Sequence, residues 1–374
     1  MRIGVNARLL IEGKMDGIGW FACQTLRHMV ADHPDDTFVL FFDRQPASAF
    51  RFGPNVETVV LYPPARHPVL WLLFFEWSLR RALHRYHCDV LLSPDGYLPL
   101  QHRIPSLVVI HDLNFEHARG NLKWYNQLYL HHFFPRFARC ATRIATVSEY
   151  SRDDIAATYH VDKDKIDVVY DGAHDDYRPH SDDEKADTRA LFTGGKPYLI
   201  FVSTILPRKN LTALFKAFDA LRERKDLKLV VVGSRVWWRD ELKQTYQSMR
   251  HRDDVLLLGH CDTPTLARLL SAAEALVYPS FFEGFGIPIL EAFHAETAVV
   301  TSNVTSMPEV AGDAALLIDP YDWHSIVDAV DQLLTQPQLR QQLIERGRRQ
   351  RERFSWKQTA DKLWQSLMRC MMES

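Results

Sequence analysis

The chain has 374 residues, which predicts two domains that are each large enough to bury a core of their own. Hydrophobic residues make up 46% and charged residues 25% of the sequence, proportions that exclude disordered and collagen-like proteins. The formal net charge of -2 argues against a general nucleic-acid-binding protein.

The cysteines lie far apart in the sequence and form no Cys-x-x-Cys pair. They are Cys23, Cys88, Cys140, Cys261 and Cys370. Such spacing predicts neither a disulfide framework nor a zinc site, and it favours the reducing environment of the cytoplasm. A strand is expected almost at the first residue, so no signal peptide is predicted.

The first half of the chain alternates short apolar runs with helical patterns. Strands are expected at residues 3–6, 38–42, 58–61, 90–92, 107–111 and 144–147. Helices are expected between them, notably at residues 19–31, 70–86 and 123–138. This alternation, with strands that are apolar throughout, predicts a parallel sheet covered by helices on both faces.

The polar segment 178–193 is interpreted as a linker or a domain boundary, after which the alternation restarts. Strands are expected at residues 198–203, 229–233, 255–259, 275–278, 298–301 and 316–319. Capping signals mark three helix starts: Thr263 before Pro264, Ser306 with Glu309, and Ser355 with Gln358. The chain is therefore predicted to form two doubly wound α/β domains in tandem, with ligands at the carboxyl ends of the strands.

One aromatic and basic segment, residues 66–85, has an apolar run that is too short for a membrane span of about 20 residues. Its basic and large aromatic residues are Arg66, Arg80, Arg81, Arg85, Trp71 and Trp77. The pattern is typical of an amphipathic helix on an anionic membrane surface. It is more commonly that of a helix facing a protein core, and both interpretations stay open.

The most informative motif is SFFEGFGIPILEA at residues 280–292. Gly284 and Gly286 precede Pro288, a residue favoured at the first helical position, so the motif predicts a loop that turns into a helix N-terminus. Free N–H groups and the helix dipole favour a phosphate there. Glycine on both sides of Phe285 lets a ligand approach the backbone.

Two acids flank this turn, Glu283 before it and Glu291 about one helical turn after it. They would repel a phosphate, but carboxylates bind the hydroxyl groups of a sugar or a ribose well. The motif therefore predicts a nucleotide-sugar site. The alternative is a tight turn with one solvated acid and one helical acid.

A second motif, TILPRKN at residues 204–210, follows the first strand of the second domain. The adjacent cations Arg208 and Lys209 suit a diphosphate, although two solvated loop charges are the simpler alternative. The sequence contains no GxxxxGK loop, which argues against a P-loop nucleotide triphosphatase. It also has no Asp-x-Asp pair at a strand end, so no metal-bridged diphosphate is predicted.

In the first domain, His111 and Asp112 close an apolar strand, where such sheets place their chemistry. A structural histidine is the alternative. Gly17 and Gly19, with Asp43 further on, also fit the fingerprint of an NAD-dependent oxidoreductase. That fingerprint needs its first glycine directly after a strand, whereas roughly ten residues precede Gly17 here, so this alternative is disfavoured.

Taken together, the motifs resemble those of the family 4 glycosyltransferases of the GT-B fold. The matching segments are residues 17–19, IHDL at 110–113, TVSEYSRDDI at 146–155, VVYDGAH at 168–174, PRKNL at 207–211, EGFGIPILEA at 283–292, SMPEVAGDAA at 306–315 and FSWKQTADKL at 354–363. The resemblance implies two Rossmann-like domains facing a cleft. Residues 1–177 would bind the acceptor and residues 178–354 the donor, with the final helix in 355–374 returning to the first domain.

The resemblance also implies roles for individual residues in a retaining transfer of a hexose. Catalytic roles fall to His111, Glu283, Arg208 and Lys209. Glu283 would hold the sugar hydroxyls, Glu291 the ribose, and the cations the diphosphate, with further donor contacts from Gly17, Gly19, Thr204, Gly284, Phe285 and Gly286. Many relatives carry an arginine where Thr204 stands, so Arg208 is assigned that role here.

Relatives with PRKN and EGFGIP are often mannosyltransferases that use GDP-mannose to assemble surface polysaccharide or lipopolysaccharide, and this donor is favoured. UDP-linked hexoses and N-acetylhexosamines remain alternatives. The acceptor is expected to be a glycan or a lipid-linked oligosaccharide, with no metal and no cofactor beyond the donor. The expected location is the cytoplasm, at the inner face of the membrane if residues 66–85 bind it. A non-catalytic nucleotide-sugar-binding subunit is the remaining alternative.

Overall fold

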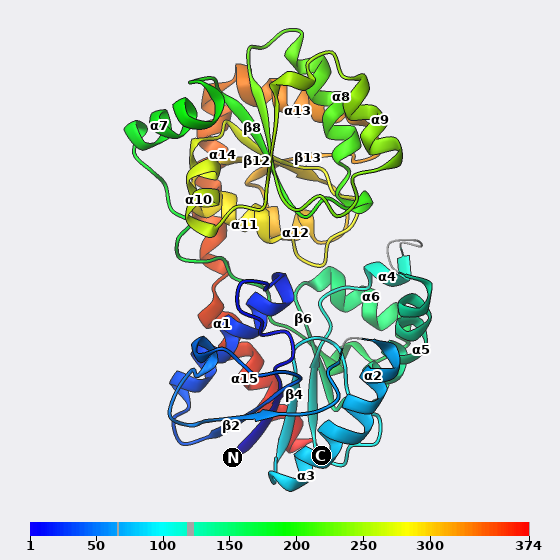
Figure 1. The fold of residues 1–374 in the computed structure, drawn as a ribbon. Coiled ribbons are helices and arrows are strands. Elements are labelled where there is room, and N and C mark those ends of the chain that lie inside the picture. Colours follow the sequence, from blue (N-terminus) through cyan, green and yellow to red (C-terminus); the bar gives the residue numbers. More distant parts are fainter. Residues whose placement is uncertain (66, 118–122, 374) are drawn as a thin grey trace. The chain divides into compact units, whose positions relative to one another are not determined.

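The structure is a computed structural model that describes residues 1–65, 67–117 and 123–373. The chain divides into two compact units (Figure 1). Unit 1 comprises Met1–Gly172 with Ser355–Ser374, and unit 2 comprises Ala173–Phe354. In the structure the first boundary between the units therefore falls after residue 172, whereas the sequence predicted it after residue 177.

Unit 1 contains a seven-stranded sheet in the order β3-β2-β1-β4-β5-β6-β7, in which every neighbouring pair is parallel. Its strands are β1 (Arg2–Asn6), β2 (Thr37–Phe42), β3 (Val56–Val60), β4 (Val90–Ser93), β5 (Ser106–Val109), β6 (Arg143–Thr146) and β7 (Ile166–Val168). The six predicted strands are confirmed, with ends shifted by about two residues at most. Strand β7 was not predicted, because it is short and has the polar Asp167 at its centre.

Helices cover both faces of this sheet (Figure 1). On one face lie α1 (Gly17–Asp32) and α15 (Trp356–Met372). The other helical elements are α2 (Pro68–Leu72), the π-helical η2 (Leu73–Leu79), α3 (Arg80–Arg85), α4 (Asn114–His117), α5 (Trp124–Cys140) and α6 (Glu149–Tyr159). Two 3-10 turns are η1 (Ser48–Phe50) and η3 (Lys163–Lys165). The predicted helix 70–86 is thus one run of three segments. Its inner side joins an aromatic core that includes Phe74, Phe75, Tyr97 and Tyr129.

Unit 2 contains a six-stranded parallel sheet in the order β10-β9-β8-β11-β12-β13. Its strands are β8 (Tyr198–Val202), β9 (Lys228–Val232), β10 (Val255–Gly259), β11 (Ala275–Tyr278), β12 (Ala298–Ser302) and β13 (Ala315–Ile318), which confirms all six predicted strands. The 3-10 turns of this unit are η4 (Pro207–Lys209), η5 (Arg252–Asp254) and η6 (Arg351–Arg353).

The helices of unit 2 form two groups on the two faces of its sheet (Figure 1). One group contains α8 (Leu211–Arg222), α9 (Asp240–Ser248) and α13 (Trp323–Thr335). The other contains α7 (Asp182–Thr193), α10 (Thr263–Ala272), α11 (Ile287–His294) and α14 (Pro337–Gln350), and the short α12 (Met307–Ala311) follows β12.

Three local predictions are wrong. The segment 178–193, interpreted as a linker, contains helix α7, because Ser181 and Glu184 form a reciprocal capping box and acids fill the first turn. The N-cap of α10 is Asp262 rather than Thr263, and its carboxylate accepts from the N–H of Thr265 at 3.0 Å. Ser306 makes no capping hydrogen bond, since its hydroxyl bonds elsewhere. The predicted cap of α15 by Ser355 is confirmed.

Each sheet has one point at which the strand order reverses. In unit 1 the chain moves from β1 to β2 and β3 on one side, and β4 then lies on the other side of β1. In unit 2 the same reversal separates β8 from β11. In doubly wound sheets ligands bind at the carboxyl ends of the strands at this switch point. The loops after β1, β4, β8 and β11 are therefore where a site is expected.

Candidate functional site

Strand β8 of unit 2 is followed by the turn η4, which carries the predicted cation pair. Asn210 ends this turn with a left-handed φ of 56° and begins α8. Its Nδ2 donates hydrogen bonds to the carbonyl oxygens of Pro279 (3.1 Å) and Pro320 (2.7 Å), which follow β11 and β13. The turn is thus tied to two other loops at the same edge of the sheet.

The two cations of this turn meet Glu283 across the switch point. Lys209 Nζ lies 2.6 Å from Glu283 Oε1, and Arg208 Nη1 lies 2.7 Å from Glu283 Oε2. Lys209 also donates to the hydroxyl oxygen of Tyr278 (2.8 Å), and Arg208 to the carbonyl oxygen of Phe282 (2.8 Å). Glu283 and Lys209 are each only 6% exposed. The acid and one of the cations are therefore held out of bulk water, while Arg208 is partly exposed.

The protonation state of Glu283 follows from these neighbours. Burial by itself would raise the pKa of the carboxyl group, but Arg208 and Lys209 outweigh burial and lower the pKa to about 2. Glu283 is thus ionised at neutral pH and cancels one of the two positive charges. This cluster of one acid and two cations lies at the end of the sheet where a doubly wound fold binds its ligand.

The glycine loop that contains Glu283 is held from the loop after β12. Ser306 Oγ lies 2.9 Å from the carbonyl oxygen of Glu283 and 2.8 Å from that of Phe285, and it donates to them. Thr305 Oγ1 accepts from the N–H of Glu283 at 3.3 Å. Gly286 then takes a left-handed φ of 108° and begins α11, with no side chain to cap the helix. The predicted turn into a helix N-terminus is confirmed.

The side chain of Phe285 points into the protein rather than into a ligand site. It is 3% exposed and packs edge to face on Phe354, with ring centroids 5.4 Å apart. Gly284 and Gly286 on either side are buried as well. Any contribution of this segment to ligand binding therefore comes from its backbone.

The second predicted acid, Glu291, lies in α11 and has a different environment. Burial raises its pKa to about 7, an effect that a hydrogen bond with the hydroxyl of Tyr177 only partly offsets. Tyr177 was not predicted from the sequence. Thr204, the other predicted donor residue in this unit, is exposed directly after β8.

His111 lies in unit 1, two residues after the end of β5. Its Nε2 is 2.9 Å from the carbonyl oxygen of Pro94, and its ring packs edge to face against Phe21 with centroids 4.8 Å apart. Burial lowers the pKa of the imidazole, which keeps it neutral at neutral pH. The neighbouring Asp112 accepts from the N–H of Asn114 at 2.9 Å and begins the next turn.

Gly17 and Gly19, which were expected to contact the donor, are both part of the first turn of α1. Asp16 caps this turn by accepting from the N–H of Gly19 at 3.0 Å. A Cβ atom at Gly19 would lie 3.1 Å from the carbonyl oxygen of Leu9, so a larger residue would crowd the segment before α1. Gly17 is exposed.

The acid required by the oxidoreductase alternative has a structural role. Asp43 is almost completely buried and pairs with Arg44, whose Nε lies 2.7 Å from its Oδ1. Its Oδ2 accepts from the N–H of Ala65 at 3.0 Å. These contacts hold the segment after β2. They leave the dinucleotide alternative without the ribose-binding acid that it needs.

Comparison with known proteins identifies the family. Residues 15–177 match the family described as Glycosyltransferase Family 4, and residues 182–350 match Glycosyl transferases group 1. The chain is 34% identical over 284 residues to the O-antigen chain mannosyltransferase B of Escherichia coli, which covers 74% of this chain and 73% of that protein. The chain is a family 4 glycosyltransferase. It is also 27% identical over 289 residues to the O-antigen chain mannosyltransferase RfbU of Salmonella typhimurium, with coverages of 75% and 76%.

The fold of this glycosyltransferase agrees with that assignment. It matches the sucrose-phosphate synthase of Thermosynechococcus elongatus with a TM-score of 0.80, 18% sequence identity and full coverage of both chains. The two parallel-sheet α/β units and this likeness confirm the predicted GT-B fold. The resemblance to mannosyltransferases drawn from the motifs is likewise confirmed.

Several residues that shape the switch point of unit 2 in the glycosyltransferase escaped sequence analysis. Tyr278 is the last residue of β11 and binds Lys209, and Ser306 holds the glycine loop. Gly233 has a φ of 145°, and a Cβ atom there would lie 1.8 Å from the carbonyl oxygen of Ser203. Its position directly after the apolar strand β9 was the one signal available for it.

Two features are absent from the residues that the structure describes. No helix in the ranges 1–65, 67–117 and 123–373 is long and apolar enough to cross a membrane. Within the same ranges, no group of three or more His, Cys, Asp and Glu side chains is arranged to hold a metal ion.

Proposed function

We propose that this glycosyltransferase transfers mannose from GDP-mannose, with retention of configuration, to a glycan or lipid-linked oligosaccharide of a surface polysaccharide. The observation that carries the proposal is the cluster at the β8/β11 switch point, in which Arg208 and the buried Lys209 both pair with the buried Glu283. The names of the two relatives, both O-antigen chain mannosyltransferases, support mannose and this acceptor class.

In this proposal the two cations act on the leaving group. Negative charge grows on the diphosphate as the bond to the sugar breaks, and a preorganised ammonium and guanidinium stabilise that charge. Before the donor binds, Glu283 holds both cations at the positions that the diphosphate will face. When the donor binds, phosphate oxygens take over part of this pairing, and the carboxylate becomes able to accept hydrogen bonds from the sugar hydroxyls.

The remaining roles concern orientation. Glu291, which lies in α11, would accept from the ribose hydroxyls, and the N–H groups at the start of α11 would face the phosphates. His111 would bind a hydroxyl beside the reacting carbon. Holding the sugar in one orientation towards the acceptor is worth a large share of the rate, because a misplacement of about 1 Å can cost on the order of 10²-fold.

We also propose that transfer needs no divalent metal, because Arg208 and Lys209 supply the positive charge at the diphosphate. Transfer measured in excess chelator is expected to equal transfer in magnesium or manganese. Activity that disappears in chelator and returns on addition of either metal would refute this part of the proposal.

The donor is tested by thermal shift with GDP, UDP, ADP and NAD, followed by transfer assays with GDP-mannose and UDP-linked hexoses. A ligand at about 100 times its Kd stabilises the native state by about 2.7 kcal/mol, which gives a measurable shift. Stabilisation by GDP and transfer from GDP-mannose are expected. Stabilisation by UDP alone would indicate a UDP-linked donor in place of GDP-mannose. A thermal shift with NAD alone would contradict the proposal.

We further propose that unit 1 rests on the cytoplasmic face of a membrane through the run α2–η2–α3. Its inner side is buried in the core, yet its outer side exposes Val69 (58%), Leu73 (48%) and Trp77 (58%), spaced four residues apart. The exposed Arg81 and Arg85 continue this stripe. An apolar stripe that leads into cations suits an anionic membrane surface. Arg66, part of the predicted segment, lies outside the described residues.

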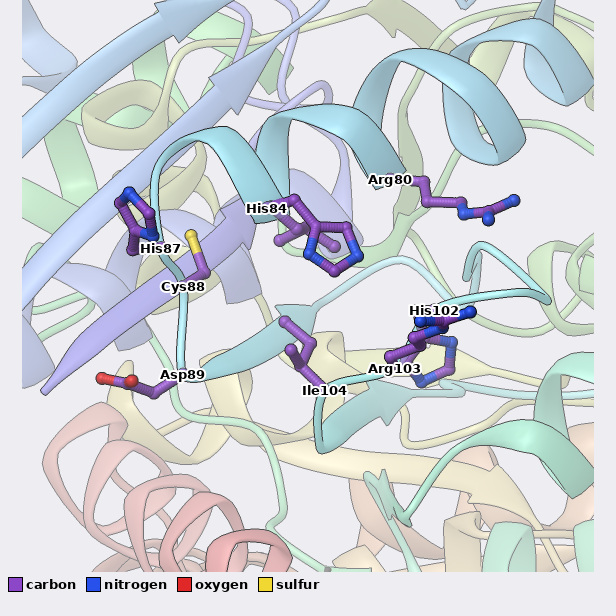
Figure 2. A pocket seen from close by; sticks show the side chains of 9 residues that line it. Arg80, His84, His87, Cys88, Asp89, His102, Arg103 and Ile104 are labelled. Atoms are coloured by element: carbon purple, nitrogen blue, oxygen red, sulfur yellow. The ribbon is translucent and has the colours of Figure 1, made fainter.

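More basic side chains lie next to α3. Figure 2 shows a pocket of about 250 Å³ that is lined by Arg80, His84, His87 and Arg103, together with the acid Asp89. Arg80 and His84 also line a second hollow, of about 950 Å³, on the side of Trp77 and Arg81. Basic groups on both sides of the helix strengthen the electrostatic part of the proposed membrane contact.

Vesicle sedimentation tests this contact. The protein is expected to sediment with vesicles that contain anionic lipid and not with neutral ones, and Trp77→Glu is expected to abolish binding. Leu191→Glu is the control, because Leu191 is equally exposed (69%) but lies in unit 2. Equal loss of vesicle binding in both variants, or no binding of anionic vesicles by the wild type, would contradict the proposal.

A further inference from the structure

The switch point of unit 1 contains a polar network centred on Asp95. Its Oδ2 lies 2.5 Å from Arg8 Nε, and its Oδ1 accepts from Asn6 Nδ2 (2.8 Å) and from the N–H of Tyr97 (3.2 Å). Ser93 Oγ lies 3.2 Å from the same Oδ1 and also donates to the carbonyl oxygen of Tyr97. Asn6, Arg8, Ser93 and Asp95 are all less than 9% exposed.

These bonds fix the turn at residues 93–97. Ser93 and Asp95 are both anchored, one at the end of β4 and the other to β1, and Pro94 lies between them with its carbonyl oxygen 2.9 Å from His111 Nε2. The position of that carbonyl oxygen is therefore set by the carboxylate of Asp95.

The contact with Pro94 decides which nitrogen of His111 carries the hydrogen. A carbonyl oxygen only accepts, so Nε2 must be the donor, and in the neutral ring Nδ1 is then the acceptor. The edge of Phe21, whose ring centroid lies 4.8 Å from that of the imidazole, restricts rotation of the ring. The side chain thus presents one defined lone pair.

We propose that Asp95 is a positioning residue: it holds the 93–97 turn so that Pro94 keeps His111 in the Nε2–H tautomer, with Nδ1 directed to accept a substrate hydroxyl. This inference rests on the proposed function for the place of His111 beside the sugar. The tautomer itself is a property of unit 1 and exists whether or not a sugar is transferred.

The tautomer is measured by ¹⁵N NMR of the histidine side chains in the wild-type protein. The resonances of His111 are assigned by their absence in His111→Gln. One Nε2–H tautomer is expected. A wild-type His111 that carries its hydrogen on Nδ1 overturns the inference without any further variant. A correct tautomer with no transfer activity would refute the proposed function and leave this inference standing.

The role of Asp95 is tested in the double variant Arg8→Met/Asp95→Asn, which removes both charges and leaves neither one buried alone. Its His111 is expected to populate both tautomers. In transfer assays kcat is expected to fall, by up to about 10²-fold, while the KM for the donor stays unchanged. A folded double variant that keeps the single tautomer and wild-type kcat overturns the inference.

Asp43→Asn is the matched control, since Asp43 is also buried, paired with an arginine and located directly after a strand of the same sheet. It should leave the tautomer and kcat unchanged. If the double variant does not fold, Ser93→Ala takes its place, because it loosens the same turn without removing a charge. A smaller change in the same direction is then expected, and an unchanged tautomer population again overturns the inference.

Discussion

The two switch points of this glycosyltransferase carry similar groups in different ratios. In unit 1, one acid, Asp95, faces one cation, Arg8. In unit 2, one acid, Glu283, faces two cations, Arg208 and Lys209. The first cluster is balanced, and neutral donors complete its hydrogen bonds. In the second, two cations share one carboxylate, an arrangement in which a phosphate can take over one of the pairings.

The surroundings of the cations agree with this difference. The guanidinium of Arg8 lies 4.3 Å from the ring centroid of Tyr97 and 5.5 Å from that of Phe75, so aromatic rings flank it. Lys209 also lies near one aromatic ring, 5.2 Å from the centroid of Tyr278, but its hydrogen bonds go to the hydroxyl of Tyr278 and to Glu283, contacts that a phosphate oxygen can replace. Charge ratio and surroundings thus distinguish a structural ion pair from one suited to exchange its partner for a ligand.

The largest expected effect is on the balanced pair. Asp95→Asn leaves Arg8 buried without its counter-charge and should lower the free energy of unfolding by about 3–5 kcal/mol. Adding Arg8→Met should restore most of that loss, because both charges are then gone. Urea denaturation of the single and double variants measures the coupling. If the losses in free energy of unfolding of the two single variants add up in the double variant, the two side chains do not act as a pair.

Lys209→Ala should reduce kcat by about 10²–10³, since one preorganised donor to the leaving diphosphate is lost. It should also weaken the binding of free nucleoside diphosphate, measured by calorimetry. Lys216→Ala is the control, because Lys216 lies in the following helix α8 and pairs with the exposed Glu241. Equal affinity in wild type and Lys209→Ala would remove this lysine from the phosphate site.

Glu283→Gln should reduce transfer on the order of 10²-fold through lost orientation of the sugar. Binding of free diphosphate should be retained or become tighter, because both cations lose their internal partner. Glu274→Gln is the matched control: Glu274 also pairs with two arginines, Arg189 and Arg340, but directly before β11. If Glu283→Gln loses diphosphate affinity as badly as Lys209→Ala does, the sugar does not lie beside Glu283.

The smallest expected effect separates Glu291 from Glu283 by pH. Folding raises the pKa of Glu291 from 4.5 to about 7, so its contribution to stability is present below pH 4.5 and lost as pH rises through 7. Folding lowers the pKa of Glu283 to about 2, so its contribution is present above pH 4.5 and lost as pH falls towards 2.

If the ribose needs the ionised form of Glu291, affinity for nucleoside diphosphate should rise about tenfold between pH 6 and pH 8 as this carboxyl group titrates. Calorimetry at both pH values, on wild type and Glu291→Gln, isolates this contribution from the ionisation of the ligand itself. The same rise in both proteins would exclude Glu291 from the donor site.

The sequence by itself determined the strands and most helices, because apolar runs, glycine and proline act through near neighbours. It also determined the family, because motifs such as that at residues 283–292 are contiguous in the sequence and can be recognised without the fold. Helix α7 escaped because its charged composition concealed the capping box at Ser181. Strand β7 escaped because a polar residue interrupts it.

Only the tertiary structure decided which charges meet. Lys209 and Glu283 lie 74 residues apart, and Arg8 and Asp95 lie 87 apart. Each pair is brought together because two non-consecutive strands are neighbours in a parallel sheet. The sequence placed Glu283 with the sugar and the cations with the phosphates, but it could not predict that they neutralise one another. The Asp95 network could not be predicted for the same reason: it depends on strand order, and the identity of a residue does not reveal which loop will lie beside it.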